Sequence, residues 1–334
     1  MITGITGQDG GYLAKFLLDK GYRVIGLYRR GATDTFSKLK EHGILDKIEL
    51  EDFELLEFSN ICRLIKKYKP DEFYNLAAQS FVAASWQEPI YTAQADGMGV
   101  LYILEAIREF SPKTKFYQAS TSEMFGKVQE IPQKETTPFY PRSPYGCAKL
   151  FAHWISVNYR ESFGIFACCG ILFNHESPMR GKEFVTRKIT DHLAKLKLNI
   201  TQDALELGNL NAKRDWGHAL DYVEGMWLML QQDKPDTYVL STGETHPIRD
   251  FVQEAARVCG FDIIWQGDGM DEIGIDRNTN KTIVKVNPKF FRPAEVELLV
   301  GDPSKAQEIL GWKRKISYKE LCRLMVEEDI KRYE

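Results

Sequence analysis

The first half of the chain alternates between two kinds of segment, and this alternation restricts the possible fold more than any other feature. Short runs rich in β-branched and aromatic residues are predicted strands at 23–28, 47–52, 72–77, 115–120 and 164–173. Between them, apolar residues recur with helical spacing at 11–20, 60–69, 97–110 and 144–162. This order predicts an α/β fold with a Rossmann-type, doubly wound parallel sheet that helices cover on both faces.

The alternation ends after residue 173, where a less regular region begins. A predicted helix at 186–198 follows, and a β-like run at 282–286 precedes two closing helices. A predicted helix at 219–231 and a strand at 238–241 are expected to return to the first sheet. We therefore expect a larger domain at 1–173, rejoined at 217–242, and a smaller, interleaved α/β domain at 174–216 and 243–334.

Composition excludes several classes of protein. The chain has 334 residues, 43% of them hydrophobic, and a net charge of −3, which gives no indication of nucleic acid or an anionic membrane as a partner. The longest apolar run, 165–173, is far shorter than the roughly 20 residues that span a bilayer and is typical of a buried parallel strand. Six cysteines without a Cys-x-x-Cys pair, and no basic-then-apolar leader, indicate reduced cysteines and a cytoplasmic location.

Three glycines near the start of the chain have a spacing that suits phosphate binding. Gly4, Gly7 and Gly10 follow a short apolar run and precede the first predicted helix, which is expected to begin at Gly11. They permit a tight turn and a close approach of the backbone to a diphosphate, which the first N–H groups of the helix would face. A glycine triplet alone is a weak signal, but one followed by a helix and a second strand indicates a dinucleotide site.

The residues after the second predicted strand indicate which dinucleotide is bound. An NAD site usually has Asp or Glu there to bind the ribose 2′-hydroxyl, whereas this chain has Arg29 and Arg30. Two guanidinium groups favour a 2′-phosphate and therefore NADP, although two solvated loop arginines would look the same in sequence. Asp52 is a candidate for binding adenine, and the segment 75–80 supplies small residues that could line the cofactor.

A second group of residues indicates proton transfer. Tyr145 and Lys149 stand at positions i and i+4 of a predicted helix that Ser143 caps, so they share one helix face. The lysine ammonium, together with an oxidised nicotinamide, is expected to lower the tyrosine pKa from its ordinary value of about 10 and make the phenol a usable base. The alternative is an amphipathic helix with a surface lysine.

A hydroxyl and a carboxylate follow the fifth predicted strand, at Thr121 and Glu123. Hydride transfer needs no carboxylate, so Glu123 indicates a second chemical step. Two alternatives stay open: Thr121 only caps the turn after the strand, and Glu123 is a solvated acid at the start of the next loop.

These motifs resemble the extended short-chain dehydrogenase/reductase family and, within it, the GDP-mannose 4,6-dehydratases. The closer resemblance runs through almost the whole chain, at 5–9, 74–80, 117–123, 129–145, 158–162, 170–178, 184–189, 214–218 and 291–297. Ser122, between the hydroxyl and the carboxylate, also matches these enzymes. The similar dTDP-glucose dehydratases have Asp at that place, and sugar-nucleotide 4-epimerases need no carboxylate at position 123.

The resemblance implies conversion of GDP-mannose to GDP-4-keto-6-deoxymannose, the first step towards deoxyhexose nucleotides such as GDP-fucose or GDP-rhamnose. Tyr145 would take the proton of the 4-hydroxyl while hydride leaves C4 for NADP, and Thr121 would hydrogen-bond O4. Glu123 would then remove the C5 proton, and the 6-hydroxyl would leave as water. Hydride would return to C6 as C5 is reprotonated, so NADP would not be consumed.

The resemblance also implies binding residues and no metal. Contacts with NADP are expected from Gly4, Ile5, Thr6, Gly7, Gln8, Asp9, Gly10, Arg29, Arg30, Asp52, Phe53, Leu76, Ala77, Ala78, Gln79, Ser80, Tyr91, Lys149, His175 and Arg180. Contacts with the GDP-sugar are expected from Ser80, Ser122, Asn174, Lys188, Gly208, Asn209, Arg214, Arg292 and Glu295. Structural roles stay open for Asn209, Glu295 and His175, and His218 is expected to be structural.

Three departures from the family pattern concern the cofactor and assembly. The first strand is short, the loop at 29–38 lacks the family's serine-rich inter-subunit segment, and Phe81 stands where a histidine is common. A homodimer or homotetramer is expected, with helices 97–110 and 144–162 as a candidate dimer contact, and the altered loop counts against a tetramer. Two other functions stay open: an additional NADPH-dependent reduction of the 4-keto group, and a non-catalytic NADP-responsive regulator.

Overall fold

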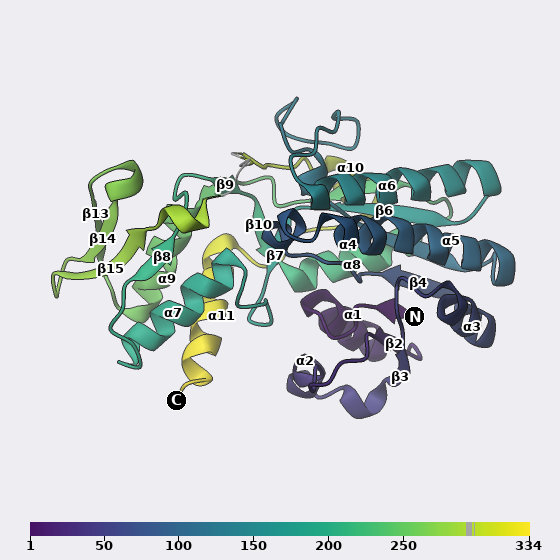
Figure 1. Cartoon of the computed structure of the whole chain (residues 1–334), viewed down its shortest axis with the longest axis horizontal. Coiled ribbons are helices and arrows are strands. Elements are labelled where there is room, and N and C mark those ends of the chain that lie inside the picture. The colour runs from purple at the N-terminus through teal and green to yellow at the C-terminus, as the bar shows by residue number, and fades with distance from the viewer. Residues whose placement is uncertain (292–295, 297) are drawn as a thin grey trace.

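The computed structural model describes residues 1–291, 296 and 298–334. Its largest element is a sheet of seven parallel strands in the order β3-β2-β1-β4-β5-β6-β11, on the right of Figure 1. The strands are β1 (Ile2–Thr3), β2 (Ile25–Tyr28), β3 (Glu49–Asp52), β4 (Glu72–Asn75), β5 (Lys115–Thr121), β6 (Ala167–Leu172) and β11 (Thr237–Leu240). The last strand returns to this sheet as predicted.

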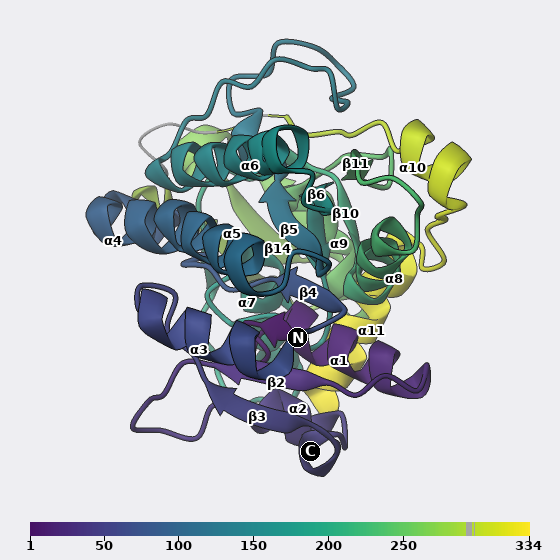
Figure 2. The same ribbon diagram turned by 90° about the vertical axis from the view of Figure 1, so that its right-hand side faces the viewer.

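Helices cover both faces of the sheet because successive strand residues bury apolar side chains on opposite sides. Tyr74 and Tyr117 belong to a core with α1 (Gln8–Asp19), α2 (Ser37–Glu41) and α8 (Ala219–Leu230). Their neighbours Phe73 and Phe116 belong to a second core with α3 (Phe58–Tyr68), α5 (Gly99–Phe110) and α6 (Pro144–Phe163). Figure 2 shows α5 and α6 on one side of the strands and α1 and α8 on the other, which confirms the doubly wound prediction.

A smaller region, on the left of Figure 1, contains a second sheet in the order β13-β14-β15-β8. It consists of β8 (Leu205–Leu207), β13 (Ile263–Gln266), β14 (Ile273–Asp276) and β15 (Lys281–Val286), with α7 (Val185–Lys197), α9 (Ile248–Cys259) and α11 (Tyr318–Lys331) around one core. Two short pairs lie between the regions, β7 (Asn174–Glu176) with β10 (Trp216–His218), and β9 (Lys213–Arg214) with β12 (His246–Pro247). The described residues also form α4 (Pro89–Ala93), a π-helical turn Gln94–Met98, and α10 (Ser304–Leu310).

Several predictions about local structure can be compared directly with this fold. The helix expected to begin at Gly11 begins earlier, at Gln8, so Gly10 and Gly11 lie inside α1. All six cysteines are unpaired, as expected for reduced thiols, but Cys147 is exposed rather than packed in a core. Within the described residues, no helix is both long enough and apolar enough to cross a membrane.

Candidate active site

The loops after β1 and β4 meet at the carboxyl edge of the large sheet, where the strand order changes direction. Thr3 joins them, because its Oγ1 accepts hydrogen bonds from the N–H groups of Leu76 and Ala77 at 2.9 and 3.0 Å. Gly4 has a φ of +65°, and a Cβ on Gly10 would lie 2.3 Å from the Gly4 carbonyl oxygen. Glycine is therefore required at both places, and the bare backbone at the start of α1 fits a diphosphate.

A cavity of about 890 Å³ lies beside these loops and is lined by residues from both regions of the molecule. This volume is within the usual range for a small-molecule site. The lining contains the predicted residues Asp9, Leu76, Ala78, Ser80, Thr121, Ser122, Glu123, Tyr145, Lys149, Asn174, His175, Arg180, Lys188, Gly208, Asn209 and Arg214. The predicted catalytic residues and most of the predicted sugar-nucleotide residues thus share one cavity.

Tyr145 and Lys149 lie on the buried face of α6. The predicted cap is confirmed, since the Ser143 Oγ accepts a hydrogen bond from the Gly146 N–H at 3.0 Å. Lys149 is 4% exposed, and its Nζ donates to the Ala119 carbonyl oxygen at 3.0 Å and lies 5.8 Å from the centre of the Tyr145 ring. This geometry rules out the surface-lysine interpretation.

Thr121 and Glu123 approach the same point from the end of β5. The Thr121 Oγ1 accepts a hydrogen bond from the Glu123 N–H at 3.2 Å, so this threonine does cap the turn, and it also lines the cavity. The first turn of α6 packs closely on this turn, because a Cβ on Gly146 would lie 3.0 Å from the Glu123 carbonyl oxygen. This close approach brings Tyr145 beside the hydroxyl and the carboxylate.

The protein's own groups raise the pKa of Tyr145. Burial is the largest cause, and the carboxylates of Asp96 and Glu123 add to it, while the side chain of Thr121 acts in the opposite direction. The predicted lowering of the Tyr145 pKa requires an oxidised nicotinamide beside Lys149, so it stays a prediction for the cofactor-bound protein. Burial also lowers the pKa of Lys149 and raises the pKa of Asp96 to about 6. The tyrosine is accordingly a phenol at neutral pH unless further positive charge is brought close to it.

His175 joins the start of α1 to the short strand β7. Its Nε2 lies 2.8 Å from an Asp9 carboxylate oxygen, its Nδ1 lies 2.8 Å from the Phe173 carbonyl oxygen, and its ring stacks on Tyr222. Burial lowers the pKa of His175, but Asp9 and the Phe173 carbonyl raise it more, so the pKa lies above its ordinary value. His175 therefore has the structural, hydrogen-bonded role left open above, and its ring also lines the cavity.

We expect the His175–Asp9 pair to stabilise the folded chain less at alkaline than at acidic pH. Because the pKa of His175 is raised in the folded chain, the stabilisation is fully present below its ordinary value of 6.5 and is lost as the pH rises through the raised pKa. A hydrogen bond to a charged group contributes about 1.5–3 kcal/mol. We expect Asp9→Asn to lower the free energy of unfolding more below pH 6.5 than well above it. Urea unfolding of both proteins at the two pH values tests this, and an equal loss at both would contradict it.

Other predicted cofactor residues surround the loops without lining the cavity. The residues that line the described cavity do not include Gly4, Ile5, Thr6, Gly7, Gln8, Gly10, Arg29, Arg30, Asp52, Phe53, Ala77, Gln79 and Tyr91. Tyr28 is opposite Asp52 in the β2–β3 register, so the exposed arginines and Asp52 lie at the same sheet edge as the glycine loop. Arg29 donates a hydrogen bond to the Tyr91 hydroxyl at 2.7 Å. Gln8 is structural as well, since its side chain accepts from the Ser177 hydroxyl and donates to the His175 carbonyl.

Three of the predicted sugar-nucleotide residues, Lys188, Gly208 and Asn209, line the cavity from the smaller region. The Lys188 Nζ lies 3.4 Å from the centre of the Phe290 ring, and burial lowers its pKa. A Cβ on Gly208 would lie 2.5 Å from the Phe290 carbonyl oxygen, which explains the glycine. The Asn209 Oδ1 accepts a hydrogen bond from the Asn211 N–H at 2.9 Å, so this residue has the structural role left open above.

Some predictions concern residues outside the cavity or outside the described chain. Arg292 and Glu295 lie outside the described residues. The His218 Nδ1 accepts from the Leu220 N–H at 3.1 Å and caps α8, as expected for a structural residue.

The cavity also has an aromatic lining that was not predicted from the sequence. Phe81, Trp86, Phe184, Phe290 and Phe291 all border the cavity. Phe81 and Phe184 contact each other edge to face, with ring centres 5.9 Å apart, and thereby join the loop after β4 to the start of α7. A paired Phe-Phe in a Gly-, Asp- and Asn-rich segment was an available signal, because an exposed aromatic in a loop often marks a binding surface.

The chain matches one family of proteins along almost its whole length. Residues 1–325 match the family described as GDP-mannose 4,6 dehydratase. A GDP-mannose 4,6-dehydratase from Yersinia enterocolitica is 52% identical over 347 residues, which cover 99% of this chain and 93% of that protein.

Solved structures with the same fold are more distant in sequence. RMD from Pseudomonas aeruginosa, complexed with NADPH, has a TM-score of 0.77 at 20% identity and covers 99% of this chain and 98% of that one. A dTDP-glucose 4,6-dehydratase from Bacillus anthracis, in complex with NAD, has a TM-score of 0.81 at 17% identity, with 99% and 96% covered. These structures share the fold, and the near-complete sequence matches show that the chain belongs to the GDP-mannose 4,6-dehydratase family.

Proposed function

We propose that the chain is a hydro-lyase that converts GDP-D-mannose to GDP-4-keto-6-deoxy-D-mannose and so begins the synthesis of GDP-deoxyhexoses. Membership of the family supports this substrate and reaction. The observation that carries the proposal is the meeting of Glu123 with Tyr145 at one cavity wall, because a buried phenol and a second proton acceptor suit an elimination that follows an oxidation.

Each residue at this wall has a role that follows from its position. Tyr145 takes the proton of the sugar 4-hydroxyl, and Lys149, fixed by the Ala119 carbonyl, holds positive charge below the ring. The Thr121 hydroxyl, at the end of β5, hydrogen-bonds O4. Glu123 takes the proton from C5, the 6-hydroxyl takes up a proton and leaves as water, and Glu123 returns a proton to C5 after hydride has reached C6.

The cofactor that suits this site is NADP. When bound, it would supply the acceptor for the hydride from C4 and the donor of hydride to C6. The glycine loop at the start of α1 would hold the diphosphate, and Arg29 and Arg30, exposed after β2, would bind the 2′-phosphate. One structure of this fold contains NADPH and another NAD, so it is the arginine pair that favours NADP.

Removing the Arg30 guanidinium is expected to lower the preference for NADP over NAD. A charge-assisted hydrogen bond contributes about 1.5–3 kcal/mol, which corresponds to roughly 10–100-fold in affinity. Arg30→Ser should therefore weaken NADP binding by about 10-fold or more, with little change for NAD. Calorimetric titration with both nucleotides measures this, and Arg63→Ser, on an outer helix, is the control. An equal loss for both nucleotides would show that Arg30 does not bind the 2′-phosphate.

The site also supports a division of labour between two domains. We place the NADP-binding domain at 1–173 with 217–242 and the sugar-nucleotide domain at 174–216 with 243–334.

A homodimer is the assembly that the α6 surface favours, because Phe151, Trp154 and Phe163 are large apolar side chains exposed on that helix. With no membrane-spanning helix described and every cysteine unpaired, a cytoplasmic location is consistent.

Incubation with GDP-mannose and NADP in deuterated water tests the proposed function. We expect a product that has lost water and carries solvent deuterium at C5, since the proton that Glu123 returns exchanges with solvent. Mass spectrometry detects both changes. Recovery of unaltered GDP-mannose from folded, NADP-binding protein would overturn the proposal.

A further inference from the structure

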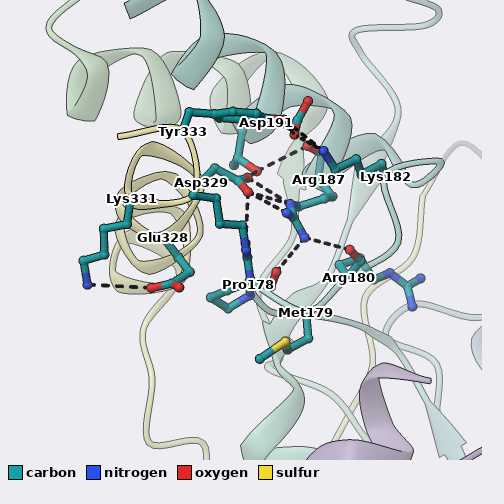
Figure 3. Close-up of polar contacts among 12 residues, drawn as sticks. Pro178, Met179, Arg180, Lys182, Arg187, Asp191, Glu328, Asp329, Lys331 and Tyr333 are labelled. Carbon is teal, nitrogen blue, oxygen red and sulfur yellow. Dashed lines mark hydrogen bonds and ion pairs between the residues drawn. The ribbon is translucent and has the colours of Figure 1, made fainter. Parts of the chain in front are cut away.

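A buried ion pair connects the C-terminal helix to the start of α7. Asp329, on α11, is fully buried, and the Arg187 Nε lies 2.9 Å from both of its carboxylate oxygens (Figure 3). The Arg187 Nη2 lies 2.6 Å from one of the same oxygens, and the Thr190 hydroxyl donates to the other at 2.7 Å. Arg332 adds a further hydrogen bond to Asp329 at 3.0 Å. The carboxylate is thus fully occupied.

The other edge of the Arg187 guanidinium holds a turn of the chain. Its Nη1 donates to the Pro178 carbonyl at 2.6 Å and to the Arg180 carbonyl at 3.0 Å. Figure 3 shows the Arg180 side chain extending away from Arg187, and this side chain lines the large cavity. Arg180 is held there by Glu176 at 3.0 Å and by the Phe184 ring at 3.5 Å.

The start of α7 is an unfavourable place for a buried cation unless an acidic residue balances its charge. It is in the first turn of α7, which contains no acidic residue and has no side-chain cap. A cation at a helix N-terminus is unfavourable, and a buried arginine without a partner is strongly destabilising. Asp329 balances this charge and leaves the Nη1 group available for the two carbonyls. The contact between α11 and α7 thus adds to the bonds that Ser177 makes with Gln8 and the Met179 N–H, and together they fix the turn at 177–181.

We propose that Asp329 is a positioning residue for nucleotide binding: through Arg187 it fixes the turn at 177–181, and thereby directs Arg180 towards the phosphates of a nucleotide in the cavity. The identity of that nucleotide, NADP, rests on the proposed function. Arg180 lines the cavity whereas Arg187 and Asp329 do not, so Asp329 acts through Arg180 and not by touching the ligand.

The test is a double-mutant cycle on NADP binding. Loss of one charge-assisted hydrogen bond to a phosphate corresponds to about 10-fold in affinity, so we expect Asp329→Asn to raise the dissociation constant for NADP by about 10-fold. Arg180→Met should weaken binding at least as much. If Asp329 acts through Arg180, the double variant binds no worse than Arg180→Met alone, whereas additive losses would overturn the proposal because independent sites add.

A control variant lies on the same helix. Glu328 forms a partly exposed ion pair with Lys331 at 3.7 Å, and Glu328→Gln should bind NADP like the unaltered protein. Should it weaken binding as much as Asp329→Asn, the effect would belong to α11 in general and the proposal would fail.

A second variant keeps the proposal testable if Asp329→Asn does not fold. Replacing both partners, as Arg187→Met with Asp329→Leu, removes the buried charges together and is often close to neutral for stability. This variant also loses the hydrogen bonds to the turn, so it should weaken NADP binding by about 10-fold, the equivalent of one charge-assisted hydrogen bond. Unchanged binding would overturn the proposal. Failure of the unaltered protein to bind NADP would instead overturn the proposed cofactor, which separates the two outcomes.

Discussion

Glu123→Gln is expected to lower the rate of product formation by about 10²–10⁴-fold and to abolish solvent deuterium at C5. The amide has nearly the same shape as the carboxylate but cannot accept the C5 proton. The backbone of the turn should be unaffected, because the Thr121 Oγ1 bonds the main-chain N–H of residue 123 and not its side chain. NADP binding and the unfolding midpoint should therefore stay close to those of the unaltered protein.

Glu183 offers a matched control for this variant. It also lines the cavity, but it lies on the exposed segment before α7, away from β5. Glu183→Gln removes the same charge from the same cavity and should leave deuterium incorporation at C5 intact. Product formation by Glu123→Gln within about 10-fold of the unaltered rate would remove this residue from the role of base.

The central sheet was predictable because its strands are buried on both faces. The segment Ala167–Leu172 is buried at every position, and an uninterrupted apolar run of this kind is typical of a parallel strand. Cys168 and Cys169 point to opposite sides, one into the core with α8 and the other towards the His153 carbonyl on α6. The period of two along the strand is enough to assign each side chain to a face.

The smaller region was harder to predict because its strands are short and one of their pairings is distant in sequence. The short strands β13 and β14 pair antiparallel, and β15 pairs with β8, far back in the chain. Helix α9, in contrast, could have been predicted. Its buried residues Phe251, Val252, Ala255, Ala256 and Cys259 have clear helical spacing in the sequence.

The candidate site shows the same division. Tyr145 and Lys149 could be identified because they are one helical turn apart, and Glu123 because it follows a predicted strand. The Arg187–Asp329 pair could not be found, because its members are 142 residues apart and no local pattern joins them. The raised pKa of Tyr145 was missed because it depends on the depth of burial and on Asp96, which comes from a separate helical segment.

Tyr145→Phe is the second variant with a large expected effect. Removal of a general base typically costs about 10²–10⁴-fold, and phenylalanine fills the same buried volume, so we expect a loss of that size with little change in stability. Tyr140, which is 52% exposed, provides the control, since Tyr140→Phe alters a tyrosine outside the wall formed by β5 and α6. Product formation is measured by mass spectrometry for both.

The pH dependence distinguishes loss of a base from loss of packing. Burial and the nearby carboxylates of Asp96 and Glu123 raise the pKa of Tyr145, so the reactive phenolate is the minor form at neutral pH and its fraction grows as the pH rises. The rate of the unaltered protein should therefore increase with pH through the neutral range, and the residual rate of Tyr145→Phe should lack this increase. A variant that is slower but keeps the same pH profile would show that Tyr145 supports the cavity wall and that another group takes the proton from O4.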